Sequence, residues 1–364
     1  MAEIVFPEPH LPAVLPSLLA LPRGAAVLVL GATDSGKSTW VREAALMLVG
    51  AGKSVAVVDC DLGQSEIGPP GTIGMALAKP GAEFRFLRDL PLGAAYFVGA
   101  ISPARHGLDV CVGAVQMARA AKKQQPDLVL IDTDGFVSGS AARQIKRRMC
   151  ELLLPQVALA LTRGSEIDPL LALFARMDAP DIWRIPVSGA AQRKTTAARA
   201  TRRTARFLAA LDQSEPQTFS LDQITLLGTF LGTGEPLPHH LLQFLSQSLG
   251  RPALHAERSG SSLFVVVNGE SWDTSGLAAI ESYFSIRSVS VMAAQKFAGL
   301  LVGLVSGSGV LLGIGRIDRI DFSRRTLSVL TPCRKPAAVA QIWLGSLRLR
   351  ADGRENGEVR PGEI

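Results

Sequence analysis

The chain has 364 residues, of which 47% are hydrophobic and 19% are charged. This length and composition exclude an intrinsically disordered chain and predict a globular protein with two domains. The net charge of +6 permits a polyanionic partner without requiring one.

The apolar stretch over residues 11–30 contains three prolines and an arginine, so it predicts no membrane span. Acidic Glu3 and Glu8 stand where a signal peptide would carry positive charge. The four cysteines show no CxxC spacing, which argues against both a disulfide framework and a zinc site. We therefore expect a cytoplasmic protein that does not bind membranes.

The predicted elements of the first half alternate between strand and helix. An apolar run over residues 25–30 ends in a glycine-rich turn, and a helical pattern covers residues 37–49. A second buried strand is predicted over 54–58, a helix over 110–122 and a third strand over 127–131. This alternation predicts an α/β domain with a doubly wound parallel sheet.

The character of the sequence changes after residue 211, where β-branched runs separated by glycine turns predict a smaller β-rich domain. The tail is rich in glycine and charge, which is compatible with disorder. The predicted parts are an N-terminal segment over 1–24, the α/β domain over 25–211 with an arginine-rich lid near 190–207, the β-rich domain over 218–351, and the tail over 352–364.

A phosphate-binding loop follows the first strand and fits GxxxxGK[ST] at every fixed position. Glycines let the backbone N–H groups turn toward phosphates, Lys37 can reach the β- and γ-phosphates, and Ser38 can ligate Mg²⁺. ATP is favoured over GTP because no Asn-Lys-x-Asp motif is present; the alternative is a degenerate loop kept for structure. The residues expected to bind ATP are Gly31, Ala32, Thr33, Asp34, Ser35, Gly36, Lys37, Ser38 and Thr39.

Carboxylates follow the next two buried strands. Asp59 and Asp61 lie at the end of the second strand, where alternation places them on one side and near the phosphates and Mg²⁺. One of them could accept a proton from an attacking hydroxyl. Asp132 ends the third strand, in the usual position of a Walker B acid. The alternative is a turn in which Asp59 and Asp61 cap local backbone groups.

Two clusters of basic residues, over 143–148 and 193–206, could attract a phosphate backbone. On a helix Arg199, Arg203 and Arg206 share one face, where like charges repel unless an anion compensates them. This spacing favours phosphate binding over a solvated helix face.

These motifs resemble the Clp/Grc-type polynucleotide 5′-hydroxyl kinases, and the likeness covers about residues 25–210. The β-rich region over 300–332 is similar to the second domain of the short prokaryotic members. The segments that carry the resemblance are 31–39, the DxDxGQ-like 59–64 with Pro69-Pro70-Gly71, 97–103, 132–137 and the arginines over 193–206.

The resemblance implies a kinase that uses ATP and Mg²⁺ to phosphorylate the 5′-hydroxyl ends of RNA or DNA. It implies that Lys37 contacts ATP, that Asp61 is the general base and that Arg199 and Arg203 form the catalytic part of the lid. The expected metal set is Ser38, Asp59, Gln64 and Asp132. The expected nucleic-acid contacts are Thr133, Gly135, Phe136, Arg147, Arg193 and Arg206.

The sequence departs from the family in two ways. Relatives carry Asn-Thr-x-Gly-Trp where residues 132–136 read Asp-Thr-Asp-Gly-Phe, which gives a smaller stacking surface and adds a negative charge at Asp134. The N-terminal domain of the eukaryotic members is also expected to be missing. The sequence identifies no protein partner. Two alternatives stay open: a catalytically silent nucleotide-binding scaffold in RNA processing, and a P-loop kinase of a small metabolite.

Overall fold

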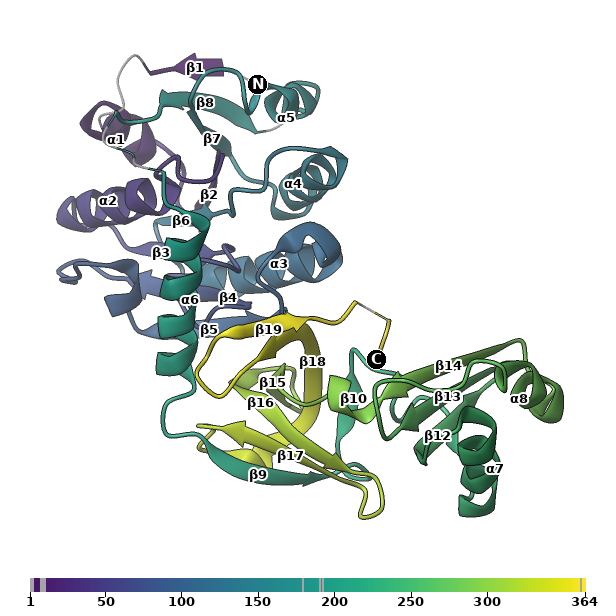
Figure 1. Ribbon diagram of the computed structural model, residues 1–364. Helices are drawn as coiled ribbons and strands as arrows, with labels where there is room; N and C mark the ends of the chain where they lie inside the picture. The colour runs from purple at the N-terminus through teal and green to yellow at the C-terminus, as the bar shows by residue number, and fades with distance from the viewer. Residues whose placement is uncertain (1–2, 7–10, 179, 190, 192, 361) are drawn as a thin grey trace. The chain divides into compact units, whose positions relative to one another are not determined.

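A computed structural model describes residues 3–6, 11–178, 180–189, 191, 193–360 and 362–364. The chain divides into two compact units, residues 1–206 and 207–364. Figure 1 shows the elements of both. Within the described residues, no helix is both long enough and apolar enough to span a membrane.

Unit 1 is built on an eight-stranded sheet in the order β1-β8-β7-β2-β6-β3-β4-β5. The strands from β1 through β3 in this order are parallel, whereas β4 and β5 are antiparallel additions. The strands are β1 (Glu3–Val5), β2 (Ala25–Gly31), β3 (Val55–Asp59), β4 (Thr72–Ala78), β5 (Leu92–Phe97), β6 (Leu128–Asp132), β7 (Val157–Thr162) and β8 (Asp181–Pro186).

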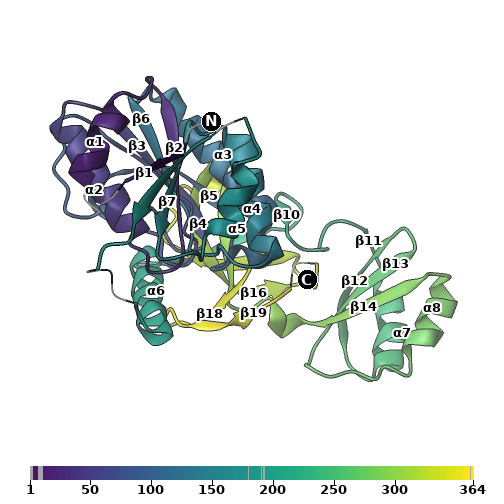
Figure 2. The same cartoon turned by 90° about the horizontal axis from the view of Figure 1, so that it is seen from above.

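Helices cover both faces of this sheet, as Figures 1 and 2 show. Helices α1 (Leu11–Leu19) and α2 (Lys37–Gly50) lie on one face, and α3 (Gly107–Lys123), α4 (Ser140–Leu153) and α5 (Asp168–Phe174) lie on the other. Every residue of β2 is buried, and its alternating side chains enter two separate cores. The predicted doubly wound α/β fold is therefore confirmed.

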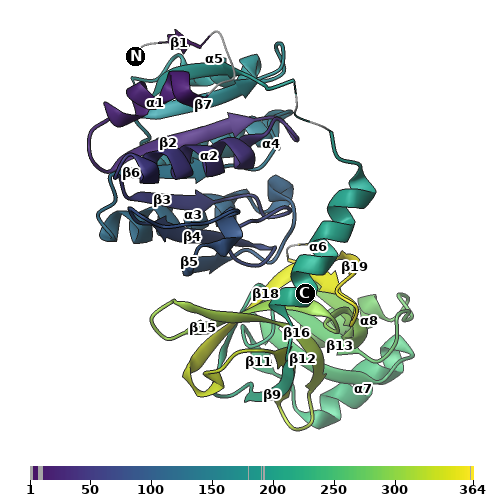
Figure 3. The same cartoon turned by 90° about the vertical axis from the view of Figure 1, so that its left-hand side faces the viewer.

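The N-terminal segment is part of the sheet domain, because β1 pairs with β8 and α1 packs near α2. The predicted lid contains α6 (Thr196–Ala210). Figure 3 shows α6 on the side of the sheet toward which β2 points, at the carboxyl ends of the parallel strands.

Unit 2 is rich in β-structure, as expected. A seven-stranded sheet has the order β10-β18-β15-β16-β17-β9, with β19 paired to β18, and a four-stranded sheet has the order β11-β12-β13-β14. Helices α7 (His239–Leu249) and α8 (Leu277–Phe284) share a core with the smaller sheet. The strands are β9 (Glu215–Ser220), β10 (Thr225–Leu227), β11 (Glu235–Pro236), β12 (Ala253–Ser259), β13 (Ser262–Val267), β14 (Ser288–Ala293), β15 (Leu300–Ser306), β16 (Leu311–Asp321), β17 (Thr326–Thr331), β18 (Val339–Leu349) and β19 (Glu355–Glu358).

The tail differs from the expectation of disorder. Strand β19 pairs with β18, and the side chains of Val359 and Ile364 are buried in the core of unit 2. The N–H of Phe230 donates to the carbonyl oxygen of Ile364 at 3.0 Å. Two apolar side chains, those of Val359 and Ile364, anchor this segment in the core. The prediction of disorder relied on the glycine and charge content and did not consider these two residues.

Candidate active site

The phosphate-binding loop lies between β2 and α2, as predicted. Gly36 has a φ of 87°, which favours glycine, and a Cβ at Gly31 would displace the Ser35 hydroxyl, because it would approach Ser35 Oγ to 2.5 Å. Lys37 Nζ donates to the carbonyl oxygens of Gly31 and Ala32 at 2.9 and 3.0 Å. The loop therefore folds around a buried ammonium group.

A second loop, residues 59–68, leaves the carboxyl end of β3 and is shaped by its own carboxylates. Asp59 is buried, and its Oδ2 accepts bonds from the N–H groups of Glu66 and Ile67 at 2.6 and 3.0 Å. Asp61 Oδ1 accepts bonds from the N–H groups of Gly63 and Gln64 at 3.0 and 2.9 Å. Within the described residues these bonds use only one carboxylate oxygen of Asp61.

The third loop follows β6 and approaches the phosphate-binding loop closely. A Cβ at Gly135 would lie 2.4 Å from Thr33 Oγ1, so only glycine permits this approach. Asp134 Oδ1 accepts a bond from the N–H of Phe136 at 2.7 Å, and its Oδ2 pairs with Lys146 Nζ at 2.7 Å. The extra negative charge noted in the sequence is therefore neutralised by a lysine of α4.

Lys146 is a site residue that the sequence analysis missed, because it was counted within a basic surface cluster. Its side chain is only 1% exposed. Helical periodicity could have predicted that Lys146 is buried, because position 146 falls on the buried face of α4. The other buried residues of this face include Ala142, Ile145, Met149 and Leu153.

Burial dominates the electrostatics of this edge of the sheet. It raises the pKa of Asp61, and neighbouring Asp134 raises it further, while the N–H groups of Gln64 and Gly63 and the charge of Lys37 oppose the rise. Burial also raises the pKa of Asp132, against the effects of Lys37 and a hydrogen bond to Ser38. The pKa of Lys37 is lowered by burial, although both acids favour its charged form.

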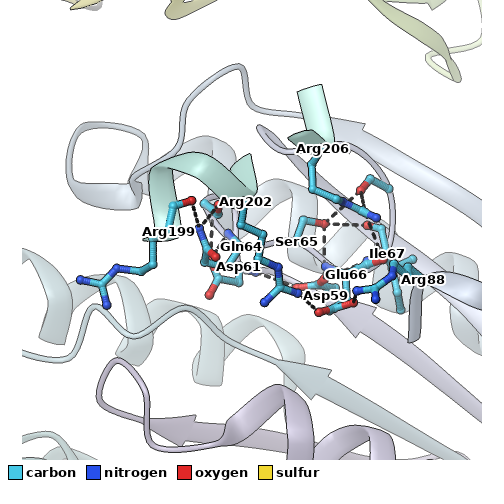
Figure 4. Close-up of polar contacts among 12 residues, drawn as sticks. Asp59, Asp61, Gln64, Ser65, Glu66, Ile67, Arg88, Arg199, Arg202 and Arg206 are labelled. Atoms are coloured by element: carbon cyan, nitrogen blue, oxygen red, sulfur yellow. Dashed lines mark hydrogen bonds and ion pairs between the residues drawn. The ribbon is translucent and has the colours of Figure 1, made fainter. Parts of the chain in front are cut away.

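Two loops of unit 1 hold the start of α6. Asp34 Oδ2 accepts bonds from Arg199 Nη1 at 2.9 Å and from the N–H of Lys194 at 3.0 Å. Gln64 Nε2 donates to the carbonyl oxygen of Arg199 at 3.2 Å (Figure 4). The lid helix is thus attached both to the phosphate-binding loop and to the loop over 59–68.

The three loops and α6 surround one cavity of about 1410 Å³, whose lining lies within unit 1. Its lining contains predicted ATP contacts, the predicted general base, predicted nucleic-acid contacts and lid arginines, but not Gly31 and Ala32. The predicted residues that line it are Thr33, Asp34, Ser35, Gly36, Lys37, Ser38, Thr39, Asp61, Gln64, Gly135, Phe136, Arg193, Arg199 and Arg203.

Asp132 and Ser38 are the residues best placed to hold a metal. Asp132 is buried, its Oδ1 has no hydrogen-bond partner among the described residues, and the Ser38 hydroxyl lowers the pKa of this carboxyl group against the effect of burial. The described residues contain no group of three or more His, Cys, Asp or Glu that could bind a metal by themselves.

Two predicted contacts lie in the interior instead of the cavity lining. The four internal bonds of Asp59 come from the N–H groups of Asp61, Glu66 and Ile67 and from Ser65, so this carboxylate has the capping role that the sequence left as an alternative. Thr133 is fully buried, and its hydroxyl donates to the carbonyl oxygen of Val29 at 2.8 Å.

Two predicted nucleic-acid arginines also lie outside the cavity lining. Arg147 pairs with Glu151 at 2.8 Å on the exposed side of α4. Arg206 is half-buried, and its Nη2 donates to the carbonyl oxygens of Glu66 and Gly68 at 3.2 and 2.8 Å. The structure thus gives Arg206 an intramolecular role that helical spacing alone could not indicate.

The strand, glycine-shaped loop, helix and adjacent strand-end acid define a P-loop nucleotide-binding protein. Residues 31–210 match the family model described as mRNA cleavage and polyadenylation factor CLP1 P-loop. The polyribonucleotide 5′-hydroxyl-kinase of Pyrococcus furiosus is 31% identical over 340 residues, which cover 93% of this chain and 92% of the relative. The chain belongs to this family of Clp1-type polyribonucleotide 5′-hydroxyl kinases.

Other similarities agree with this family. The polyribonucleotide 5′-hydroxyl-kinase of Thermococcus kodakarensis is 30% identical and is covered to 95% of its length, with 96% of this chain aligned. A solved Clp1p–Pcf11p complex contains a chain that shares the fold, with a TM-score of 0.58 at 12% identity. That likeness covers 92% of this chain and 77% of the other. The resemblance inferred from sequence is confirmed, and membership in a P-loop kinase family implies ATP binding.

Proposed function

We propose that this protein transfers the γ-phosphate of ATP to the 5′-hydroxyl end of a polynucleotide in a reaction that requires Mg²⁺. One observation carries the proposal: Asp61, whose Oδ1 is held by two N–H groups of its own loop, lines the same cavity as Lys37 and arginines of α6. Phosphoryl transfer to a hydroxyl requires a group that accepts the proton of the hydroxyl. It also requires positive charges that bind the phosphates and stabilise the negative charge of the transferred group.

Asp61 acts as the general base in this proposal. Its bonds to the N–H groups of Gly63 and Gln64 fix the carboxylate in place and leave the second oxygen to accept the proton of the attacking hydroxyl. The raised pKa makes Asp61 a stronger base than an exposed aspartate.

Arg199 and Arg203 of α6 contribute positive charge to the cavity that they line. Negative charge spreads over the transferred phosphoryl group, and an arginine held against it can contribute roughly 10³–10⁵ in rate. Asp34 orients Arg199 through the bond at 2.9 Å. Gly135 and Phe136 line the cavity and contact the terminal nucleotide, while Arg193 adds a further basic group at the rim.

Mg²⁺ fits the residues present. Ser38 and Asp132 would hold it, because the buried Oδ1 of Asp132 has no partner among the described residues and the Ser38 hydroxyl lies beside the same carboxylate. Protein sites usually hold Mg²⁺ through one or two carboxylates together with substrate phosphates. When bound, the ion neutralises charge on the phosphate oxygens. Gln64, whose buried Oε1 also has no partner in the described chain, would complete its outer shell.

The test is transfer of label from γ-labelled ATP to oligonucleotides with a 5′-hydroxyl, with RNA and DNA compared side by side. A 5′-phosphorylated oligonucleotide is the matched control and should accept no label. Transfer to the hydroxyl ends that depends on Mg²⁺ supports the proposal. Label transferred only to mononucleosides would indicate a metabolite kinase, and no transfer with intact ATP binding would indicate a silent scaffold.

A further inference from the structure

The side chain of Glu66 is contacted by arginines from two segments that are distant in sequence. Arg202 of α6 forms an ion pair with Oε1, and Arg88 donates to Oε2 at 3.0 Å (Figure 4). The Glu66 side chain is 14% exposed. Arg206 adds bonds to the carbonyl oxygens of Glu66 and Gly68. One short stretch of loop therefore receives three guanidinium groups.

The backbone of Glu66 belongs to the same hydrogen-bonded unit as Asp61. Asp59 accepts bonds from the N–H of Glu66 at 2.6 Å and from the N–H of Asp61 at 3.0 Å. A shift of the loop at Glu66 would therefore be transmitted through Asp59 to the proposed base. The loop presents Asp61 to the cavity at one end and Glu66 to α6 at the other.

The arginines of α6 form two pairs that are each spaced by four residues. Arg199, Arg202 and Arg203 line the cavity, and of these Arg202 also pairs with Glu66. Arg206 lies outside the lining and bonds to two carbonyl oxygens of the loop. Because all four belong to one rigid helix, the bonds of Arg202 and Arg206 fix the rotation and position of the other two. The bond from Gln64 to the carbonyl oxygen of Arg199 adds a third attachment.

We infer that Glu66 is a positioning residue that couples α6 to the loop carrying Asp61, so that base and lid arginines are held together at the cavity. This inference rests on the proposed kinase function. Glu66 supplies the negative charge that an arginine stripe on α6 needs, and charge-assisted bonds of this type are stronger than neutral ones. Its loss would leave Arg88 and Arg202 facing each other without a carboxylate between them.

The experiment compares Glu66→Gln, Arg202→Gln and the double variant with the wild-type protein. Glu66→Gln keeps the side-chain size and the N–H that bonds to Asp59. We expect kcat to fall about 10²-fold, the cost of misplacing catalytic groups by roughly 1 Å, while the KM for ATP stays unchanged. Arg202→Gln should act similarly, and the double variant should lose little more, because both changes break one coupling.

Glu151→Gln is the matched control, since Glu151 also pairs with two arginines, Arg147 and Arg148, but lies outside the cavity lining. It should keep the wild-type kcat. Additive losses in the double variant, or a Glu66→Gln enzyme as active as wild type, would overturn the inference.

Hydrogen exchange separates this inference from the kinase proposal. Without any substrate, amides over residues 196–206 should exchange at least about tenfold faster in Glu66→Gln than in wild type, whereas amides of β2 should be unchanged. Faster exchange in a protein without transferase activity would retain the coupling and reject the kinase proposal. Unchanged exchange over 196–206 in an active kinase would reject the coupling alone.

Discussion

The phosphate-binding loop over residues 31–36 and the loop over 59–68 both leave the carboxyl ends of parallel strands, yet they are shaped differently. Gly36 and Asp34 have φ values of 87° and 60°, so backbone conformation shapes the first loop. Asp59 and Asp61 shape the second by accepting bonds from N–H groups inside the loop. In a loop whose shape depends on backbone conformation, the backbone N–H groups stay available to bind a ligand. In a loop held by its own carboxylates, those N–H groups are already bonded, so the loop can contact a ligand only through its side chains.

The largest effect is expected at the first loop. Lys37→Ala should abolish phosphate transfer, because it removes the ammonium group that follows the loop and reaches the phosphates. Thermal unfolding should occur at the same temperature or higher, since the ammonium is buried and burial lowers its pKa. Transfer assays and thermal melts measure the two quantities. An active Lys37→Ala enzyme would move the ATP site away from this loop.

The second loop is tested at Asp61. Asp61→Asn should lower kcat by roughly 10²–10⁴-fold, the usual range for loss of a general base, with the KM for ATP nearly preserved. Asparagine keeps an acceptor for the N–H groups of Gly63 and Gln64, so the loop should keep its shape. A loss confined to the KM for ATP would assign Asp61 to the metal shell.

The pH dependence of the wild-type reaction is a second test of Asp61 as the general base. Burial and Asp134 raise the pKa of Asp61 above the ordinary aspartate value, and the base works only when ionised. Activity should therefore be present above the folded-state pKa and fall as the pH decreases through it. The acid limb of kcat against pH should lie higher than for an exposed aspartate. The limb should disappear in the residual activity of Asp61→Asn.

The loop after β6 depends both on a glycine and on a carboxylate. Gly135 permits its close approach to Thr33, and Asp134 accepts a bond from the N–H of Phe136. Phe136→Ala should weaken oligonucleotide binding by about 1–3 kcal/mol regardless of base identity, the usual value of one stacking contact. Phe136 also packs against the sheet core, so the melting temperature must be measured with the affinity. Early melting with normal binding would assign Phe136 to the core.

The smallest effect is expected away from the loops, at Arg147. If it contacts the nucleic-acid backbone, Arg147→Ala should raise the KM for the oligonucleotide slightly and lower the salt slope by about 0.7, and lysine should restore both. Arg206→Lys should restore little, because its guanidinium serves two carbonyl oxygens. Equal rescue by lysine at both positions would contradict the difference between them.

The two loops also show how far the sequence alone can predict a site. The phosphate-binding loop was predicted residue by residue, because its glycines and lysine have fixed spacing. Asp61 lines the cavity, whereas Asp59, expected as a metal ligand, accepts bonds inside the loop; this difference depends on how the loop closes on itself. Both carboxylates accept bonds from N–H groups of the loop, and the sequence does not show that only Asp61 also lines the cavity.

Contacts between distant segments were the least predictable. Glu66 meets Arg202 across 136 positions of sequence, and no local pattern indicates that pairing. Helical spacing predicted the row of arginines on α6, but it did not show that Arg202 and Arg206 bond to the loop over 59–68. Lys146 could have been placed by periodicity, since it shares the buried face of α4 with Met149.

The buried pair of Lys146 and Asp134 has a consequence for how this site can evolve. Replacing either residue alone strands its partner's charge in the interior, which usually destabilises a protein by about 3–5 kcal/mol. Replacing both with a neutral pair of similar volume removes that penalty. Substitutions at positions 134 and 146 should therefore occur together among descendants of this sequence, although eleven residues separate the two positions.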